Sequence, residues 1–370
     1  MLSGLRIVEI CGIGPGPFCA MHLADLGADV IAVERPTSTA PGLSAADRHV
    51  LNRGKRSIVA DLKTPEGREL VLRLIEDADA LIEGMRPGVM ERLGLGPDVC
   101  MARNPRLVFG RMTGWGQTGP LAQAAGHDNN YISLSGALYY AGSAAEPPSS
   151  PITVIGDVGG GALYLAVGIL SGVLNARSTG KGTVVDAAIV DGSAHMLQLL
   201  LGTRRKGFIG GERGASMHDS SHFYSTYRCA DGAYITVGAL EPQFYALLLE
   251  HLGLTADPRY SSQWDRQHWP ELHSHLTGIF ASKTRAEWCA LLESTDVCFA
   301  PVLSPDEAAR HPHNVARGIY FEEDGELQAR PAPRFDGKAV APGPIPTRGQ
   351  HTVEIERALD DPAQARLWRS

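Results

Sequence analysis

The stretch Leu5-Arg6-Ile7-Val8-Glu9-Ile10-Cys11-Gly12-Ile13-Gly14-Pro15-Gly16-Pro17-Phe18 decides the fold class. Residues 5–10 form a short apolar run typical of a buried strand, and a helix is predicted over 18–26, after the glycines. A strand, a glycine-rich turn and a helix in this order begin an α/β unit. The turn lacks the third glycine of G-x-G-x-x-G because Pro17 occupies that position, and prolines have no N–H to hold a pyrophosphate. The sequence therefore predicts an α/β unit and argues against a nicotinamide dinucleotide site.

The alternation of strand and helix continues through the first part of the chain. Further strands are predicted at 29–33, 57–61, 80–83, 107–111, 152–155 and 183–187, and helices at 65–77, at 161–176 and from 188 to about 200. Short β-branched runs separated by helices favour an α/β fold with a doubly wound, mostly parallel, Rossmann-like sheet. Because the segment 161–176 is apolar along its length, we expect that helix to be buried.

The length of 370 residues suggests two domains. We expect a large α/β domain over 1–200, with 325–370 a candidate to return to it. Residues 201–223 are polar and rich in Gly, Ser and His, which is typical of a linker. A small α+β domain is predicted over 224–320, beginning with a hairpin of strands 224–229 and 233–237 and continuing with helices at about 241–252, 269–281 and 285–293.

Composition and charge narrow the classes of function. With 44% hydrophobic and 20% charged residues the chain can bury a sizeable core, which excludes a disordered protein. A net charge of -7 argues against a nucleic-acid-binding protein. The N-terminal half nevertheless carries many cations, namely Arg35, Arg53, Lys55, Arg56, Lys63, Arg86, Arg92 and Arg111. They fit a phosphate-bearing ligand, although a solvated basic face explains the charge equally well.

The cysteines and histidines indicate neither a disulfide framework nor a metal site. None of the 6 cysteines forms C-x-x-C, so we expect reduced thiols and a cytoplasmic location. The closely spaced histidines lack the Cys or acidic partners of a metal ligand set, so no metal is expected. No apolar run approaches about 20 residues, and the N-terminus lacks the pattern of a secretory leader, so no membrane segment is predicted.

Two polar residues beside glycines are candidate acid/base groups. His127 lies in the run Ala-Gly-His-Asp-Asn-Asn-Tyr at 125–131, and Asp157 lies in Ile-Gly-Asp-Val-Gly-Gly-Gly at 155–161. A base and a carboxylic acid on opposite sides of one carbon can remove a proton from one face and return it to the other. From the residues alone, a helix N-cap is the favoured interpretation of Asp157, and a structural role for His127 remains open. Glu241 is best explained as a first-turn acid that complements a helix dipole.

Motifs along nearly the whole chain resemble those of the type III CoA-transferase superfamily. The matching stretches are Gly14-Pro15-Gly16-Pro17-Phe18, Gly54-Lys55-Arg56-Ser57, Ala60-Asp61-Leu62-Lys63, Arg92-Leu93-Gly94-Leu95-Gly96-Pro97, Met112-Thr113-Gly114-Trp115-Gly116-Gln117-Thr118-Gly119, Gly180-Lys181-Gly182, Val185-Asp186-Ala187 and Val237-Gly238-Ala239-Leu240-Glu241-Pro242-Gln243-Phe244-Tyr245. The run Gly126-His127-Asp128 resembles the alpha-methylacyl-CoA racemase branch of this superfamily.

The resemblance implies a role for each matching residue. His127 and Asp157 match the two acid/base residues, and Glu241 matches the acid that pairs with the histidine. Positions that bind the CoA ester are matched by Arg35, Ala60, Asp61, Leu62, Lys63, Arg86, Gly126, Asp128, Asn129, Asn130 and Tyr131. The resemblance also implies an interlocked homodimer, an acyl-CoA substrate and no cofactor, since CoA is part of the substrate. The run Ser220-Ser221-His222-Phe223 departs from the family pattern near the expected acyl site, which leaves the acyl preference open.

Three functions remain as alternatives. The first is a racemase that interconverts (R)- and (S)-2-methylacyl-CoA thioesters by two-base proton transfer through an enolate. The second is a type III CoA-transferase, in which Asp157 would be the nucleophile and the histidine would be absent. The third is a protein that binds CoA esters without catalysis. His127 is the residue that favours the racemase over the transferase.

Overall fold

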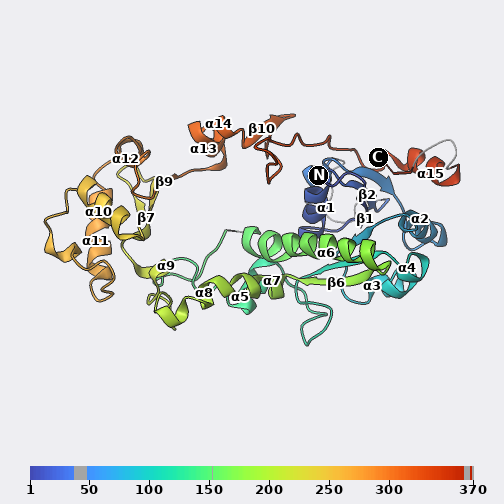
Figure 1. Ribbon diagram of the computed structural model, residues 1–370, viewed down its shortest axis with the longest axis horizontal. Coiled ribbons are helices and arrows are strands. Elements are labelled where there is room, and N and C mark those ends of the chain that lie inside the picture. Colours follow the sequence, from blue (N-terminus) through green and yellow to red (C-terminus); the bar gives the residue numbers. More distant parts are fainter. Residues whose placement is uncertain (37–47, 152, 362–366, 369–370) are drawn as a thin grey trace. The chain divides into compact units, whose positions relative to one another are not determined.

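The computed structural model describes residues 1–36, 48–151, 153–361 and 367–368, and they fall into two compact units (Figure 1). The first unit comprises Met1–Ala137, Pro151–Met196 and Ala329–Ser370. The second comprises Leu138–Ser150 and Leu197–Gln328. The segment 138–150, which the sequence-based division places in the large domain, thus packs with the second unit.

A six-stranded parallel sheet forms the centre of the first unit. Its strands are β1 (Arg6–Ile10), β2 (Asp29–Glu34), β3 (Arg56–Val59), β4 (Ala80–Glu83), β5 (Val108–Thr113) and β6 (Thr183–Ala188), in the order β3-β2-β1-β4-β5-β6. Every strand pairs with its neighbours in parallel. The connections run in opposite directions from β1 and β4, so the topological switch point lies between these two strands. The predicted α/β class with a parallel, Rossmann-like sheet is confirmed.

Helices cover both faces of this sheet, as a doubly wound fold requires. They are α1 (Pro15–Asp25), α2 (Pro65–Ile75), α3 (Val89–Arg92), α4 (Pro97–Arg103), α5 (Asp128–Ser135), α6 (Leu163–Thr179), α7 (Ile189–Met196) and α15 (Thr352–Asp360), with a 3-10 turn at Val50–Asn52. Alternate strand residues enter opposite cores because successive side chains point to opposite faces. Ile7 and Val30 pack with residues of α1 and α6, whereas Val8 and Ile31 pack with residues of α2 and α15.

The predicted strand at 152–155 is wrong for the part that the structure describes. Val154–Ala162 forms a π-helix, labelled η2, which continues directly into α6. The β-branched residues at 152–154 suggested a strand, but the glycines that follow them pack backbone against backbone on α7. A Cβ on Gly192 would overlap the carbonyl of Gly160, and one on Gly160 would overlap Ser193. Such π-helical turns occur often at functional sites.

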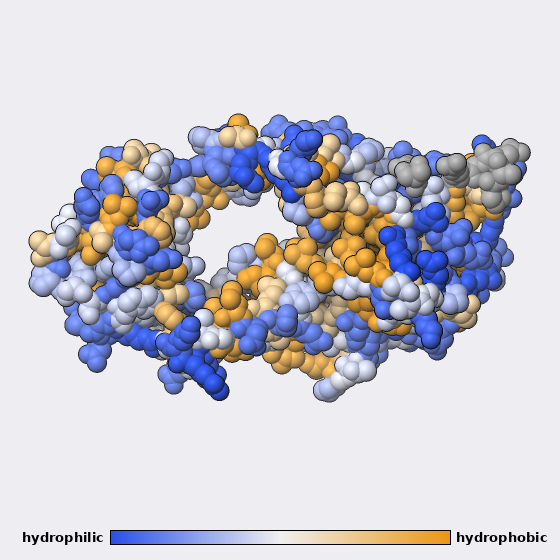
Figure 2. Space-filling view, in the orientation of Figure 1, coloured by the Kyte–Doolittle hydropathy of each residue, from blue (hydrophilic) through white to orange (hydrophobic). Residues whose placement is uncertain are grey.

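The combined helix Val154–Thr179 is long and apolar enough to cross a membrane by length and composition, although no such run was expected. The core helix of a soluble protein passes the same test. Here α6 packs on β5 and β6 with Leu165 and Ile169 buried, while Val167 is 64% and Leu174 70% exposed. The expected burial is therefore confirmed for one side only. Figure 2 shows hydrophobic residues gathered on the surface over α6.

The second unit is built on a three-stranded antiparallel sheet. Its strands are β7 (Tyr224–Arg228), β8 (Tyr234–Gly238) and β9 (Phe299–Val302), in that order. The predicted hairpin is confirmed, whereas β9 was missed because Pro301 interrupts its pattern. Its longer helices are α10 (Pro242–His251), α11 (Trp269–Phe280) and α12 (Arg285–Leu292), and its shorter elements are α8 (Gln198–Leu201), η3 (Arg204–Lys206), α9 (Met217–Ser220), η4 (Pro258–Tyr260), α13 (Pro305–Arg310), α14 (Pro312–Arg317), β10 (Tyr320–Glu323) and β11 (Glu326–Ala329).

The segment 201–223, predicted as a linker, is a packed part of the second unit. Met217 and Phe223 are buried in its aromatic core. Arg213 donates hydrogen bonds to the carbonyls of Glu146 and Ser143, which fasten 138–150 to the same unit. The polar composition suggested a linker because these contacts reach residues far away in the sequence.

Candidate active site

The predicted site residues of the first unit lie where its parallel strands end. Arg35 follows β2, Ala60 follows β3 and Arg86 follows β4, all on the carboxyl-terminal edge of the sheet. Ligands of open α/β sheets bind at this edge, beside the switch point. The strand order therefore brings together residues that the sequence scatters over its first half.

His127 is held at the start of α5 by the backbone around it. Its N–H donates to Oδ1 of Asn130 at 3.0 Å, and its carbonyl accepts from the Asn130 N–H at 2.8 Å. The hydroxyl of Tyr131 donates to the carbonyl of Gly126, so the peptide before His127 is fixed as well. A Cβ on Gly114 would overlap the Tyr131 ring, which explains that glycine. The imidazole itself is exposed.

Asp157 lies in the first turn of η2, half-buried and close to α5. Its backbone N–H donates to Oδ1 of Asp128 at 2.7 Å. One carboxylate oxygen of Asp157 faces the loop after β1, because a Cβ on Gly14 would lie 3.7 Å from Oδ2. Burial and then the charge of Asp128 raise the pKa of Asp157 to about 6, while His127 opposes the shift. A carboxyl group with such a pKa exchanges its proton near neutral pH, as an acid/base catalyst must.

The three cations predicted to bind the CoA ester, Arg35, Lys63 and Arg86, are exposed at this edge. Arg35 lies beside the loop after β4, with its Nη2 4.0 Å from the sulfur of Met85. The backbone of Ala60 is tied to β2, since its N–H donates to the carbonyl of Glu34 at 2.9 Å. Their role in binding CoA stays a prediction. Arg86 follows β4 at the switch point, Arg35 follows the adjacent β2 and Lys63 follows the edge strand β3, and their exposure along this edge is consistent with a phosphate-bearing ligand.

Four other cations of the basic half are structural. Arg53, Lys55, Arg56 and Arg111 are each at least 94% buried and form ion pairs with Asp25, Glu9, Asp29 and Glu83 respectively. A buried charge must be paired because its desolvation is costly. These residues therefore do not contribute to the phosphate-binding hypothesis, which now depends on the exposed cations alone.

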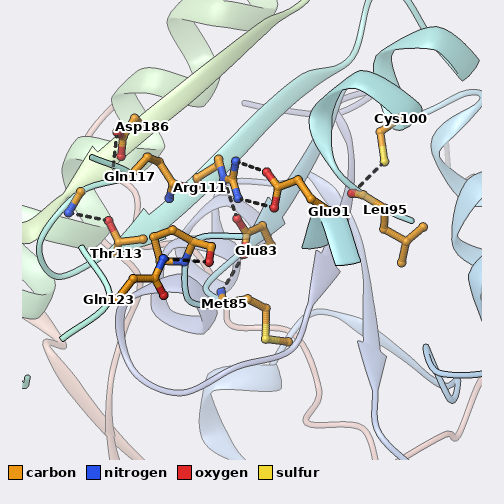
Figure 3. A network of polar contacts seen from close by, with 12 residues as sticks. Glu83, Met85, Glu91, Leu95, Cys100, Arg111, Thr113, Gln117, Gln123 and Asp186 are labelled. Atoms are coloured by element: carbon orange, nitrogen blue, oxygen red, sulfur yellow. Dashed lines mark hydrogen bonds and ion pairs between the residues drawn. The ribbon is translucent and has the colours of Figure 1, made fainter. Parts of the chain in front are cut away.

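The Arg111 pair also shapes the loop that carries Arg86 (Figure 3). Arg111 bridges Glu83 at 3.0 Å and Glu91 at 2.7 Å, and the other oxygen of Glu83 accepts from the Met85 N–H at 2.7 Å. The side-chain amide of Gln123 donates to the carbonyl of Pro87 at 3.2 Å. The backbone on both sides of Arg86 is thus fixed from β5 and from the segment before α5. Sequence reasoning missed this network, because Arg111 was counted with the ligand-binding cations.

Comparison with known proteins agrees with this geometry. The sequence model of the family described as CoA-transferase family III matches residues 2–352 of this chain.

The chain belongs to CoA-transferase family III.

Among members of the family, the human alpha-methylacyl-CoA racemase is 43% identical over 96% of this chain and 92% of its own length. The succinyl-CoA--D-citramalate CoA-transferase of Chloroflexus aurantiacus is more distant, at 30% identity over 96% of this chain and 92% of its own. A solved structure of a CAIB/BAIF family protein from Brucella suis superposes with a TM-score of 0.81 at 30% identity, covering 97% of this chain and 99% of that one.

Glu241, the third predicted catalytic residue, belongs to the second unit. It is exposed and stands directly before α10, where Pro242 takes the first helical position. Its carboxylate lies close enough to Cys298 to raise the pKa of that thiol, after the larger effect of burial. Glu241 occupies the N-cap position of α10, one residue before its first turn, and its side chain makes no capping hydrogen bond. Pairing of Glu241 with His127 remains a prediction.

Three of the four residues of the segment that departs from the family pattern lie inside the second unit. Ser221, His222 and Phe223 are fully buried in the core of the second unit. The Nε2 of His222 lies 2.7 Å from the Tyr245 hydroxyl, and burial lowers the pKa of His222 to about 3. This buried histidine is a core residue, which its polar neighbours in the sequence concealed. Among the described residues, no group of His, Cys, Asp and Glu is arranged to hold a metal ion.

Proposed function

We propose that this chain is an alpha-methylacyl-CoA racemase, which interconverts (R)- and (S)-2-methylacyl-CoA thioesters. The observation that carries the proposal is the placement of His127 and Asp157 together at the carboxyl-terminal edge of the sheet, with the pKa of Asp157 raised to about 6. The full-length similarity to the human racemase supports the same reaction, since the transferases are less similar.

The reaction is a proton transfer at the carbon next to the thioester. The imidazole of His127 takes the Cα proton from one face, and the C–H electron pair moves into an enolate. Protonated Asp157 then donates its proton to the other face of the same carbon, so the C–H bond re-forms with inverted configuration. In the reverse direction the two groups exchange roles, so the pair must hold one proton in total.

The start of α5 can stabilise the enolate. The first N–H groups of a helix have no partner within the helix, and the helix dipole makes this end positive. His127 precedes the first turn of α5 and its carbonyl already accepts from the Asn130 N–H, so the thioester oxygen of a substrate beside it would meet the N–H groups of Asp128 and Asn129. Donors aimed at a developing negative charge usually contribute the largest part of such catalysis.

The CoA part of the substrate would serve as a handle. Arg35, Lys63 and Arg86 would meet its phosphates, and the binding energy obtained there would position the acyl carbon between His127 and Asp157. Glu241 would orient the imidazole and stabilise its cation, as a carboxylate does for the histidine of a catalytic triad.

One epimer of a 2-methylacyl-CoA incubated in deuterium oxide tests the proposal. We expect deuterium at Cα together with inversion, without any acceptor acid. Asp157→Asn should abolish inversion but still allow His127 to exchange the proton that faces it, so exchange and inversion separate. Full inversion by this variant would contradict the two-base mechanism, and binding without exchange by the wild type would indicate a protein that only binds CoA esters.

The transferase alternative makes a different prediction for Asp157. As a nucleophile it would form an acyl anhydride, which borohydride or hydroxylamine would trap on the protein. Mass spectrometry of the wild type treated with an acyl-CoA and either reagent distinguishes the two reactions. An adduct on Asp157, together with transfer of CoA to a second acid, would establish the transferase.

A homodimer and a cytoplasmic location are also part of the proposal. The exposed apolar side of α6, with Leu163, Val167 and Leu174, offers surface that a second copy would cover. Light scattering behind a sizing column gives the mass in solution, and fractionation of cells that produce the tagged chain gives its location.

A further inference from the structure

The surroundings of Asp128 indicate a role other than the CoA contact that the resemblance implies. Its side chain is turned inward, and the residue is 5% exposed. Its Oδ1 accepts from the Asp157 N–H at 2.7 Å, across the interface between α5 and η2. An inward carboxylate bonded to the protein backbone is poorly placed to bind a solvent-exposed phosphate ester, and it would repel one.

The packing around Asp128 is tight enough to fix its position. A Cβ on Gly156 would overlap Oδ1 of Asp128 and would lie 2.9 Å from Cγ2 of Ile132. Only glycine at position 156 therefore lets the backbone of η2 approach the carboxylate this closely. Asp128 is the residue directly after His127, at the start of α5. Its side chain therefore links the segment that carries His127 to the turn that carries Asp157.

We propose that Asp128 is a positioning residue, which fastens Asp157 to the start of α5 and, through its charge, sets the pH range in which the His127–Asp157 pair holds one proton. The inference rests on the proposed racemase function. A negative charge beside the pair favours proton retention, so it keeps the singly protonated pair populated toward neutral pH.

The other ionisable groups around η2 have hydrogen-bond or ion-pair partners of their own, or lie on elements that pack against η2 without a bond to the Asp157 backbone. On α5, the hydroxyl of Tyr131 is bonded to the carbonyl of Gly126. Burial and then the charge of Asp157 raise the pKa of this phenol, while Arg86, from the loop after β4, opposes the shift. Four groups on the elements packed against η2 have partners of their own: His195 on α7 bonds Tyr164 of α6 at 2.6 Å, Asp25 on α1 pairs with Arg53, Arg111 on β5 pairs with Glu83, and Asp186 on β6 accepts from the Gln117 N–H. Two further groups are the exposed Asp191 on α7 and the half-buried His22 on α1. Asp128 is thus the charged group bonded directly to the turn of Asp157.

The test is Asp128→Asn, which keeps an oxygen acceptor for the Asp157 N–H and removes the charge. We expect the pH profile of kcat/KM for racemisation to move toward acid by about one pH unit, because the pair loses its proton more easily. The shift must be equal for both epimers, since their equilibrium constant does not depend on pH. The affinity for a 2-methylacyl-CoA should stay within about twofold, as expected for a residue without substrate contact.

Asp98→Asn is the matched control, because it makes the same change in the exposed first turn of another helix of the first unit. It should leave the profile in place. An unshifted profile in Asp128→Asn would overturn the proposal, and weaker CoA-ester binding with an unshifted profile would make Asp128 a substrate contact. If Asp128→Asn does not fold, Asp128→Ser provides a second uncharged variant with a side-chain oxygen.

A titration independent of activity separates this inference from the proposed function. In protein labelled with carboxyl-13C aspartate, the Asp157 resonance is assigned by its loss in Asp157→Asn. It should titrate at lower pH in Asp128→Asn than in the wild type. An unchanged midpoint would overturn the role of Asp128 whatever the reaction, whereas a shifted midpoint in a protein without racemase activity would refute only the proposed function.

Discussion

His127 and His222 show how differently two regions of this protein treat the same side chain. His127 stands exposed at the start of α5, beside a half-buried carboxyl group whose pKa is raised to about 6. His222 is fully buried among aromatic rings in the second unit, and its pKa is lowered to about 3. Partial burial leaves the carboxyl proton of Asp157, beside His127, exchangeable near neutral pH, whereas full burial fixes the His222 imidazole in its neutral form. Burial thus separates a candidate catalyst from a structural residue.

Removal of His127 gives the largest expected effect. His127→Ala should lower the rate of α-proton exchange by about 10²- to 10⁴-fold, the usual contribution of a positioned acid/base group. The melting temperature should hardly change, because the imidazole is exposed. Deuterium uptake into each epimer measures the rate. Near-wild-type exchange by a folded variant would remove the distinction between the two histidines and the racemase proposal with it.

The opposite outcome is expected for His222. His222→Ala leaves the Tyr245 hydroxyl without its partner and opens a cavity, so we expect a loss of about 2–4 kcal/mol in stability. Thermal unfolding measures this loss, and the exchange rate of the folded fraction reports the site. If exchange fell while the melting temperature held, His222 would belong to the catalytic machinery.

The pH dependence of stability sharpens this contrast. The unfolded chain binds a proton at His222 below about pH 6.5, whereas the folded chain resists protonation until about pH 3. The unfolded state therefore binds more protons in this window, so the stability contributed by neutral His222 is present above about pH 6.5 and is lost as pH falls toward 3. His222→Phe should weaken this acid sensitivity, as melting temperatures between pH 7 and 4 would show. An identical pH dependence in the variant would assign the acid sensitivity to other groups.

The smallest expected effect is on CoA-ester affinity, and it distinguishes an exposed cation, Arg35, from a buried one, Arg53. Arg35→Ala should weaken binding of a CoA ester by roughly tenfold or less, with a smaller loss at high salt, if it contacts a phosphate. Arg53→Ala, which strips Asp25 of its buried partner, should instead lower the melting temperature. Calorimetric titrations at two salt concentrations and thermal unfolding of both variants provide the comparison. Equal CoA affinity of Arg35→Ala and the wild type would leave Arg35 as part of a solvated face.

Local patterns were sufficient for most of the fold and failed where distant contacts decide the structure. The strand at 80–83 was predicted with its observed bounds, and the helix at 65–77 nearly so, because Thr64 caps α2 and Pro65 begins it. The run at 152–155 was assigned to a strand by the same reasoning. There the choice depends on close packing between Gly160 and Gly192, which no local pattern records.

The sequence by itself determined the alternation of strands and helices, the hairpin of the second unit and the candidate acid/base residues. These features depend on interactions within a few residues, or on motifs that can be matched one residue at a time. Only the tertiary structure decided that Arg53, Lys55 and Arg56 pair with acids 27 to 46 residues away, and that Asp128 bonds the backbone of Asp157. Whether a charge binds a ligand or is neutralised inside the protein depends on its desolvation and on the partners that the fold brings to it. Both are properties of the packed chain, so charge and motif alone cannot settle them.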